Sequence, residues 1–123
     1  MNKRSATEFF RGPERYNCAQ AVVKAFQQEC AIPEQVIHDY AQKGSGRAEG
    51  GLCGALYAAR AVLTDPAEIA ALEQRFVERA GAKQCREIRR LNKLSFRESV
   101  EAAEEIFRTI RPLGRGVEPG AAE

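Results

Sequence analysis

The stretch DPAEIAALEQRFVERAG, residues 65–81, contains the signals of one complete amphipathic helix. Asp65 followed by Pro66 is typical of a helix start, and Gly81 is typical of a helix end. Between these ends, the apolar side chains recur at helical spacing as Ile69, Leu72, Phe76 and Ala80. We therefore predict a helix with one buried face.

Patterns of the same kind recur on both sides of this helix. The other stretches with helical periodicity are residues 6–11, 17–30, 33–42, 52–63, 84–92 and 96–111. Asn17 and Ser95 are suited to cap two of them, although the first of these two helices could also begin a turn earlier, at Pro13. No segment alternates apolar and polar residues as a strand does. The predicted fold is all-α, a compact bundle of five to six short helices.

The composition is that of one globular domain. The 123 residues are 44% hydrophobic and 29% charged, which is typical of folded proteins. We expect a helical domain over residues 1–112 and a mobile tail over residues 113–123. No apolar run is long enough to cross a membrane and no signal peptide is recognisable, so we expect a cytoplasmic protein without a membrane partner. Bundles of short helices often dimerise, so we also expect a homo-oligomer.

The charges nearly cancel, but they are unevenly distributed. The formal net charge is +2, from 19 basic and 17 acidic residues. The basic residues that gather between positions 83 and 97 are Lys83, Arg86, Arg89, Arg90, Lys93 and Arg97. This segment is either a solvated face with ion pairs to other helices or a surface that binds an acidic partner. The domain is not strongly basic, so nucleic acid is not an expected partner.

The four cysteines do not follow the spacing of common metal or redox motifs. The absence of a C-x-x-C pair excludes zinc-ribbon and thioredoxin motifs, and the absence of C-x-x-C-H excludes covalent c-type haem. Cys18, Cys53 and Cys85 fall at the starts of predicted helices. Cys30 lies on the apolar face of residues 17–30, so we expect it in the core.

A helix start presents free N–H groups that stabilise a thiolate, so we expect lowered pKa values for Cys18, Cys53 and Cys85. Arg86 would act on Cys85 in the same direction. If the three sulfurs converge, they form a soft-ligand metal site or a reactive dithiol with a third sulfur nearby. We expect at least two of them to line a common pocket. The alternative is that all three are packing residues.

The stretch GSGRAEGGLCG, residues 44–54, is too rich in glycine for a helix. It predicts a tight loop before Cys53, with positive φ angles or close backbone approach. Gly46, Gly50 and Gly51 are the positions where we expect the loop to let a cofactor or ligand come close.

Three motifs in this order resemble one family. They are YNCAQAV at residues 16–22, CGAL at residues 53–56 and QCRE at residues 84–87, and together they resemble the redox-active family known by its pattern C_GCAxxG_C_C. The resemblance runs from about Phe9 to Phe107. The chain also resembles split-Soret cytochromes, but it lacks their haem-attachment signature.

The resemblance implies that Cys18, Cys53 and Cys85 are the redox residues or metal ligands of the family pattern. The GCAxxG element falls on residues 46–51, where its cysteine is replaced by Arg47. A four-thiolate iron–sulfur site would therefore lack one ligand. Arg47 could instead lower the pKa of nearby thiols and hold an anionic substrate.

Two functions follow as hypotheses. The first is a thiol-based redox-active or metal-binding protein that uses Cys18, Cys53 and Cys85, with Arg47 as an electrostatic helper, a metal ion or iron–sulfur cluster as the possible cofactor and a redox protein as partner. The second is a non-catalytic helical module that binds an acidic partner through residues 83–97. Whether the protein is an enzyme, and on which substrate, does not follow from the sequence.

Overall fold

The computed structural model describes residues 5–44 and 48–111, and no strand forms within them. The all-α prediction is confirmed. The helices are α1 (Ala6–Phe9), α2 (Cys18–Ala25), α3 (Gln27–Cys30), α4 (Glu34–Asp39), α5 (Gly54–Val62), α6 (Pro66–Ala80), α7 (Cys85–Leu91) and α8 (Phe96–Ile110), with 3₁₀ turns η1 (Tyr40–Gln42) and η2 (Glu49–Gly51). Gly46, Arg47 and the tail at residues 113–123 lie outside the described residues.

Local capping chemistry sets the ends of the longest predicted helix. The Asp65 carboxylate accepts a hydrogen bond from the N–H of Ala67 at 3.0 Å, and Pro66 opens α6. Gly81 ends the helix with φ +88°, a left-handed conformation that glycine adopts without steric cost. Both boundaries agree with the sequence prediction.

Two capping boxes start α2 and α8. The Asn17 side chain accepts from the N–H of Gln20 at 2.8 Å, while the Gln20 side chain accepts from the N–H of Asn17 at 3.1 Å. Ser95 and Glu98 make the same reciprocal pair at 3.1 Å and 2.8 Å. Each box satisfies N–H groups that have no partner inside the helix, so α2 begins after Asn17 rather than at the alternative start at Pro13.

The predicted helix over residues 17–30 is divided. Phe26 has φ −94° and ψ 0°, which ends α2 and leaves α3 as a separate turn. The Phe26 ring is fully buried and stacks on Phe107 of α8, with 4.2 Å between the ring centroids. The break therefore occurs where a large side chain is anchored to a helix from the other end of the chain.

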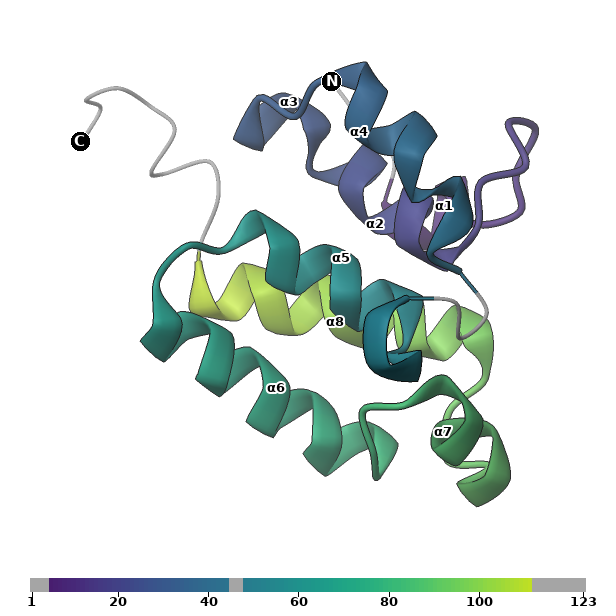
Figure 1. Cartoon of the computed structure of the whole chain (residues 1–123), viewed down its shortest axis with the longest axis vertical. Helices are drawn as coiled ribbons and strands as arrows, with labels where there is room; N and C mark the ends of the chain where they lie inside the picture. Colours follow the sequence, from purple (N-terminus) through teal and green to yellow (C-terminus); the bar gives the residue numbers. More distant parts are fainter. Residues whose placement is uncertain (1–4, 45–47, 112–123) are drawn as a thin grey trace.

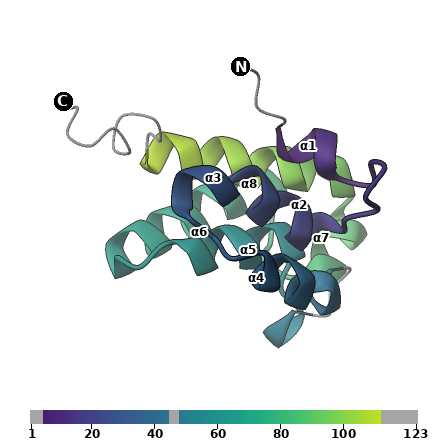
Figure 2. The ribbon, with the colours of Figure 1, turned by 90° about the horizontal axis from the view of Figure 1, so that it is seen from above.

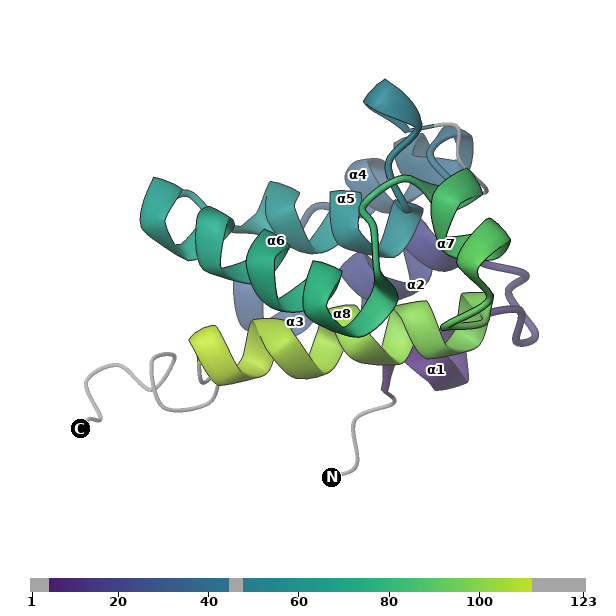
Figure 3. The same ribbon diagram turned by 90° about the horizontal axis from the view of Figure 1, so that it is seen from below.

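Helices α5 and α8 lie side by side in the middle of the molecule, with α2 on one side and α6 on the other (Figure 1). From above, α1 and α2 lie against this layer (Figure 2), and from below α6 packs along α5 and α8 (Figure 3). The residues that allow this close approach are fully buried alanines: Ala19, Ala21, Ala55, Ala58, Ala59, Ala102 and Ala103. Among the described residues, no helix has both the length and the apolar character that crossing a bilayer requires.

A buried carboxylate attaches the first helix to the last. Glu104 of α8 is 9% exposed and accepts a hydrogen bond from the N–H of Ala6 at 2.9 Å. Its other oxygen accepts from Arg108 at 3.0 Å. The charge is thus paired and hydrogen-bonded, as a buried carboxylate must be.

Candidate functional site

Three cysteines lie at the starts of three helices, as the sequence predicts. Cys18 is the first residue of α2, Cys53 is the N-cap of α5 and Cys85 is the first residue of α7. Their side chains are buried, with exposures of 4%, 4% and 7%. The N-terminal ends of α2 and α5 and the whole of α7 gather at one end of the molecule (Figures 1 and 3).

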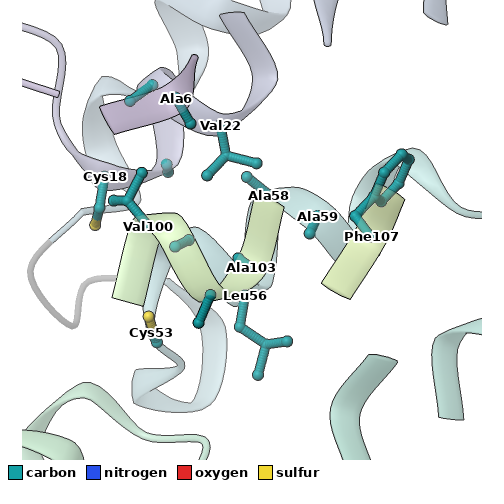
Figure 4. Close-up of a cluster of buried hydrophobic side chains, with 14 of the residues drawn as sticks. Ala6, Cys18, Val22, Cys53, Leu56, Ala58, Ala59, Val100, Ala103 and Phe107 are labelled. Carbon is teal, nitrogen blue, oxygen red and sulfur yellow. The ribbon is translucent and has the colours of Figure 1, made fainter. Parts of the chain in front are cut away.

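A glycine allows Cys18 to approach the start of α5. A Cβ atom on Gly54 would lie 2.6 Å from the Cys18 Sγ and 2.8 Å from the Lys43 carbonyl oxygen, both closer than such atoms can come. The Cys18 sulfur therefore packs directly against the backbone next to Cys53. Figure 4 shows the Cys18 and Cys53 sulfurs at the same edge of the buried cluster.

A short backbone pairing brings the third cysteine to the other two. Leu52 forms an antiparallel bridge with Gln84, and the N–H of Cys53 donates to the Lys83 carbonyl at 2.8 Å. This pairing joins the segment before α5 to the segment before α7. Cys53 is the residue after Leu52 and Cys85 is the residue after Gln84, so the bridge holds the two cysteine-bearing segments next to each other.

The three thiols act on one another electrostatically. Burial raises the pKa of Cys53 to about 12, and negative charge on Cys18 and on Cys85 adds to the increase. The backbone N–H groups of Leu56 and Ala55 oppose this increase in the pKa of Cys53. Since charge on either of the other two sulfurs would shift the titration of Cys53, and charge on Cys18 that of Cys85, the three side chains lie within electrostatic range of one another. We call them the thiol cluster.

The predicted lowering of the pKa is wrong for two of these cysteines. For Cys85, burial is the largest effect and raises the pKa, the Arg89 guanidinium lowers it, and charge on Cys18 raises it. At Cys53 and Cys85, the free-energy cost of removing a thiolate from water exceeds the stabilisation that the helix start provides. The guanidinium that acts on Cys85 is also Arg89, one helical turn away, rather than the adjacent Arg86.

A pocket of about 550 Å³ opens beside Cys85. The residues that line it are Gly50, Gly51, Gln84, Cys85, Arg86, Arg89 and Phe96. Gly50 and Gly51 have φ +69° and +71°, as expected for the glycine loop. Cys18 and Cys53 do not contribute to this lining, so the expectation that two sulfurs would share a pocket is not met here.

Two arginines, Arg86 and Arg89, give the pocket its charge. The sequence pointed only to Arg86, because it is adjacent to Cys85. Arg89 stacks on the Phe96 ring with its Cζ 4.0 Å from the ring centroid, and one of its Nη atoms donates to the Ser99 hydroxyl at 3.4 Å. Its Nε is buried and has no acceptor among the described residues. Helical spacing could have indicated Arg89, because a residue four positions after Cys85 lies on the same face of α7.

The fourth cysteine lies elsewhere. Cys30 ends α3 and packs, partly buried, against the core. Burial raises its pKa, and Arg111 opposes that effect most strongly. This location agrees with the prediction that Cys30 is a packing residue. His38, the single histidine, is exposed on α4.

The described side chains do not outline a metal site at the thiol cluster. Within residues 5–44 and 48–111, no group of three or more His, Cys, Asp or Glu side chains is disposed to hold a metal ion. The metal site and the iron–sulfur cluster stay predictions.

The basic segment at residues 83–97 is partly engaged within the protein. Lys83 pairs with Glu73 at 3.7 Å, and Arg90 with Glu87 at 2.8 Å. Arg97 donates to the carbonyl of Thr7 at 2.8 Å. These contacts favour the solvated, ion-paired interpretation for part of the segment, and the acidic partner stays a prediction.

A family model described as "Putative redox-active protein (C_GCAxxG_C_C)" matches residues 16–110, which include all three helix-start cysteines and both pocket arginines. Neither the curated proteins nor the solved structures contain a match.

Proposed function

The chain belongs to the C_GCAxxG_C_C family, whose description is "Putative redox-active protein", and from this premise we propose that the protein carries out thiol–disulfide exchange in the thiol cluster. The observation that carries the proposal is that three cysteines from three helix starts lie within electrostatic range of one another, with one of them beside a pocket. Buried cysteines that serve only packing have no need to meet, whereas disulfide exchange requires it.

Cys85 is the thiol that meets the substrate. It lines the pocket, and it is the most exposed of the three at 7%. Burial raises the pKa of Cys85, and Arg89 opposes that effect and so favours the thiolate that must form before attack.

Cys18 is the second thiol of the exchange. Its charge influences the titration of Cys85, so its sulfur is within electrostatic reach. Cys53, with a pKa of about 12, stays protonated at neutral pH and is a poor nucleophile there.

The proposed reaction has two steps. The Cys85 thiolate attacks a substrate disulfide, forming a mixed disulfide and releasing one substrate thiol. The Cys18 thiol then loses its proton to water and attacks the Cys85 sulfur, forming a Cys18–Cys85 disulfide and releasing the second thiol. The substrate gains two electrons and the protein loses two, so a thiol reductant must restore the protein.

The test is the reaction of the native protein with dithiodipyridine, a neutral chromogenic disulfide. We expect a fast phase in the wild type that Cys85→Ser abolishes. In Cys18→Ser, the mixed disulfide should form but should not resolve, and mass spectrometry should detect it. Cys30→Ser is the control and should keep both steps.

Mass spectrometry of the oxidised wild type should also show a link between Cys18 and Cys85. A fast phase that survives in Cys85→Ser, or thiols that react only after unfolding, would contradict the proposal.

A further inference from the structure

We infer that the pocket beside Cys85 selects a low-molecular-weight disulfide that carries a carboxylate, with Arg86 and Arg89 holding the carboxylate while the disulfide faces Cys85. This inference rests on the proposed thiol–disulfide exchange and adds the substrate class.

Among the described residues, the side chains that line the pocket include basic groups and no acid. Of its lining residues, two are arginines and none is Asp or Glu. Arg86 makes no hydrogen bond or ion pair with any described residue, in contrast to Arg90 on the same helix, which is held by Glu87 at 2.8 Å. Arg86 interacts electrostatically with Glu87, which does not line the pocket. The lining itself presents two guanidiniums, which attract anions and are suited to bind a planar carboxylate through paired N–H groups.

Arg89 is held in place and still has a donor to offer. Its stacking on Phe96 and its bond to Ser99 fix the guanidinium plane. The buried Nε has no acceptor within the described residues, so the guanidinium's remaining N–H groups are the ones that can face the pocket.

The rest of the pocket suits a small molecule. Its volume of about 550 Å³ lies in the range of small-ligand sites. The space next to Gly50 is open, because a Cβ built there would meet nothing within 4 Å. Phe96 supplies an apolar wall, and the Gln84 side chain offers a further polar group.

Cys85 and Arg89 are four positions apart on α7, so their side chains lie on the same face. A disulfide whose carboxylate lies a few bonds from its sulfur can therefore reach both groups at once. The Cys85 thiolate then attacks the nearer sulfur, the S–S bond breaks, and the distal sulfur leaves as a thiolate that takes a proton from water. The electrons balance as in the proposed exchange.

The experiment compares two chromogenic aromatic disulfides, the dianionic dithiobis(nitrobenzoate) and the neutral dithiodipyridine. The measured quantity is the ratio of their rate constants at Cys85, taken in the Cys30→Ser background. We expect Arg86→Ala to lower this ratio roughly three- to tenfold, chiefly by slowing the anionic probe. Arg89→Lys keeps the charge but loses the fixed planar donors, so it should lower the ratio less.

The matched control is Arg90→Ala. It removes the same charge from the same helix but from outside the pocket, so the ratio should change less than twofold. If Arg86→Ala and Arg90→Ala change the ratio equally, the selection is a general charge effect and the inference is overturned. In that case, rapid reaction of both probes at Cys85 would leave the proposed exchange intact.

A second arm needs no reaction. In Cys85→Ser, dithiodipropionate should shift the amide resonances of residues 84–89 and 96 in an NMR titration, and the neutral bis(hydroxyethyl) disulfide should shift them far less. Equal shifts with both compounds, or none with the anion, would overturn the inference even if the thiols prove inert.

Discussion

Replacing Gly54 with Ala tests whether Cys18 packs against the start of α5. The backbone of Gly54 does not have a positive φ, so alanine meets no conformational obstacle there. The obstacle is steric, because the new Cβ would lie 2.6 Å from the Cys18 Sγ, 2.8 Å from the Lys43 carbonyl oxygen and 3.3 Å from the Gly44 Cα. Two of these three neighbours are backbone atoms that cannot rotate away.

Gly54→Ala has two opposing effects on the free energy of unfolding, one from helix propensity and one from steric overlap. Alanine is a better helix former than glycine, which would stabilise α5 by at most about 1 kcal/mol at its first residue. Non-bonded heavy atoms prefer separations of about 3.5–4.0 Å, so the contact with Cys18 is short by about 1 Å. Overpacking of this kind costs about 1–3 kcal/mol, and the backbone contacts put Gly54→Ala at the upper end. We expect a net destabilisation of about 2 kcal/mol.

The assay is urea unfolding in a double-mutant cycle with Cys18→Ala. Removing the sulfur relieves one of the three short contacts of Gly54→Ala, so the double variant should be more stable than the sum of the single variants predicts, by about 1 kcal/mol. Gly50→Ala is the control, because its φ of +69° strains alanine while nothing lies within 4 Å of the new Cβ. It should show no coupling to Cys18. Additivity within about 0.5 kcal/mol for Gly54→Ala would refute the packing of Cys18 on Gly54.

Two further predictions concern buried ionisable groups. The Cys53 pKa is about 12 in the folded protein against 9.0 for an ordinary cysteine, so folding favours the protonated thiol. The contribution of Cys53 to the free energy of unfolding is therefore complete below pH 9 and is lost as the pH rises toward 12. Unfolding by urea at about pH 8 and about pH 10.5 should therefore show a smaller loss for Cys53→Ala than for the wild type, and equal losses would contradict the burial of this thiol. Glu104→Ala leaves the N–H of Ala6 and the Arg108 guanidinium without their carboxylate, and should cost about 2–3 kcal/mol in the same assay. Glu104→Gln keeps an acceptor for Ala6 and should cost less, so identical losses would count against this role.

The sequence predicts the helix boundaries best where capping is local. Asp65 and Ser95 make their capping bonds to residues two and three positions away, so the pattern alone is sufficient. The division at Phe26 has no such signal, because neither glycine nor proline is present. Its ring is instead held by Phe107, which lies far along the chain.

The candidate site shows the same limit. The placement of Cys53 and Cys85 at helix starts follows from the sequence, but the direction of their pKa shifts does not, because depth of burial depends on the packing of other helices. Adjacency in the sequence pointed to Arg86, whereas helical geometry brings Arg89 to act on Cys85. The pocket wall formed by Phe96 comes from a different helix, α8.

The bridge between Leu52 and Gln84 has a consequence for how relatives of this protein can diverge. Between these residues the chain runs out along α5, turns at residues 63–65 and returns along α6 (Figure 1). The bridge holds the two ends of this helical hairpin together, while its turn lies at the opposite end of the molecule. Insertions or deletions at the turn can therefore accumulate during evolution without displacing Cys53 from Cys85. A search that requires a constant number of residues between these two cysteines would miss such relatives, whereas one that looks for the paired segments would find them.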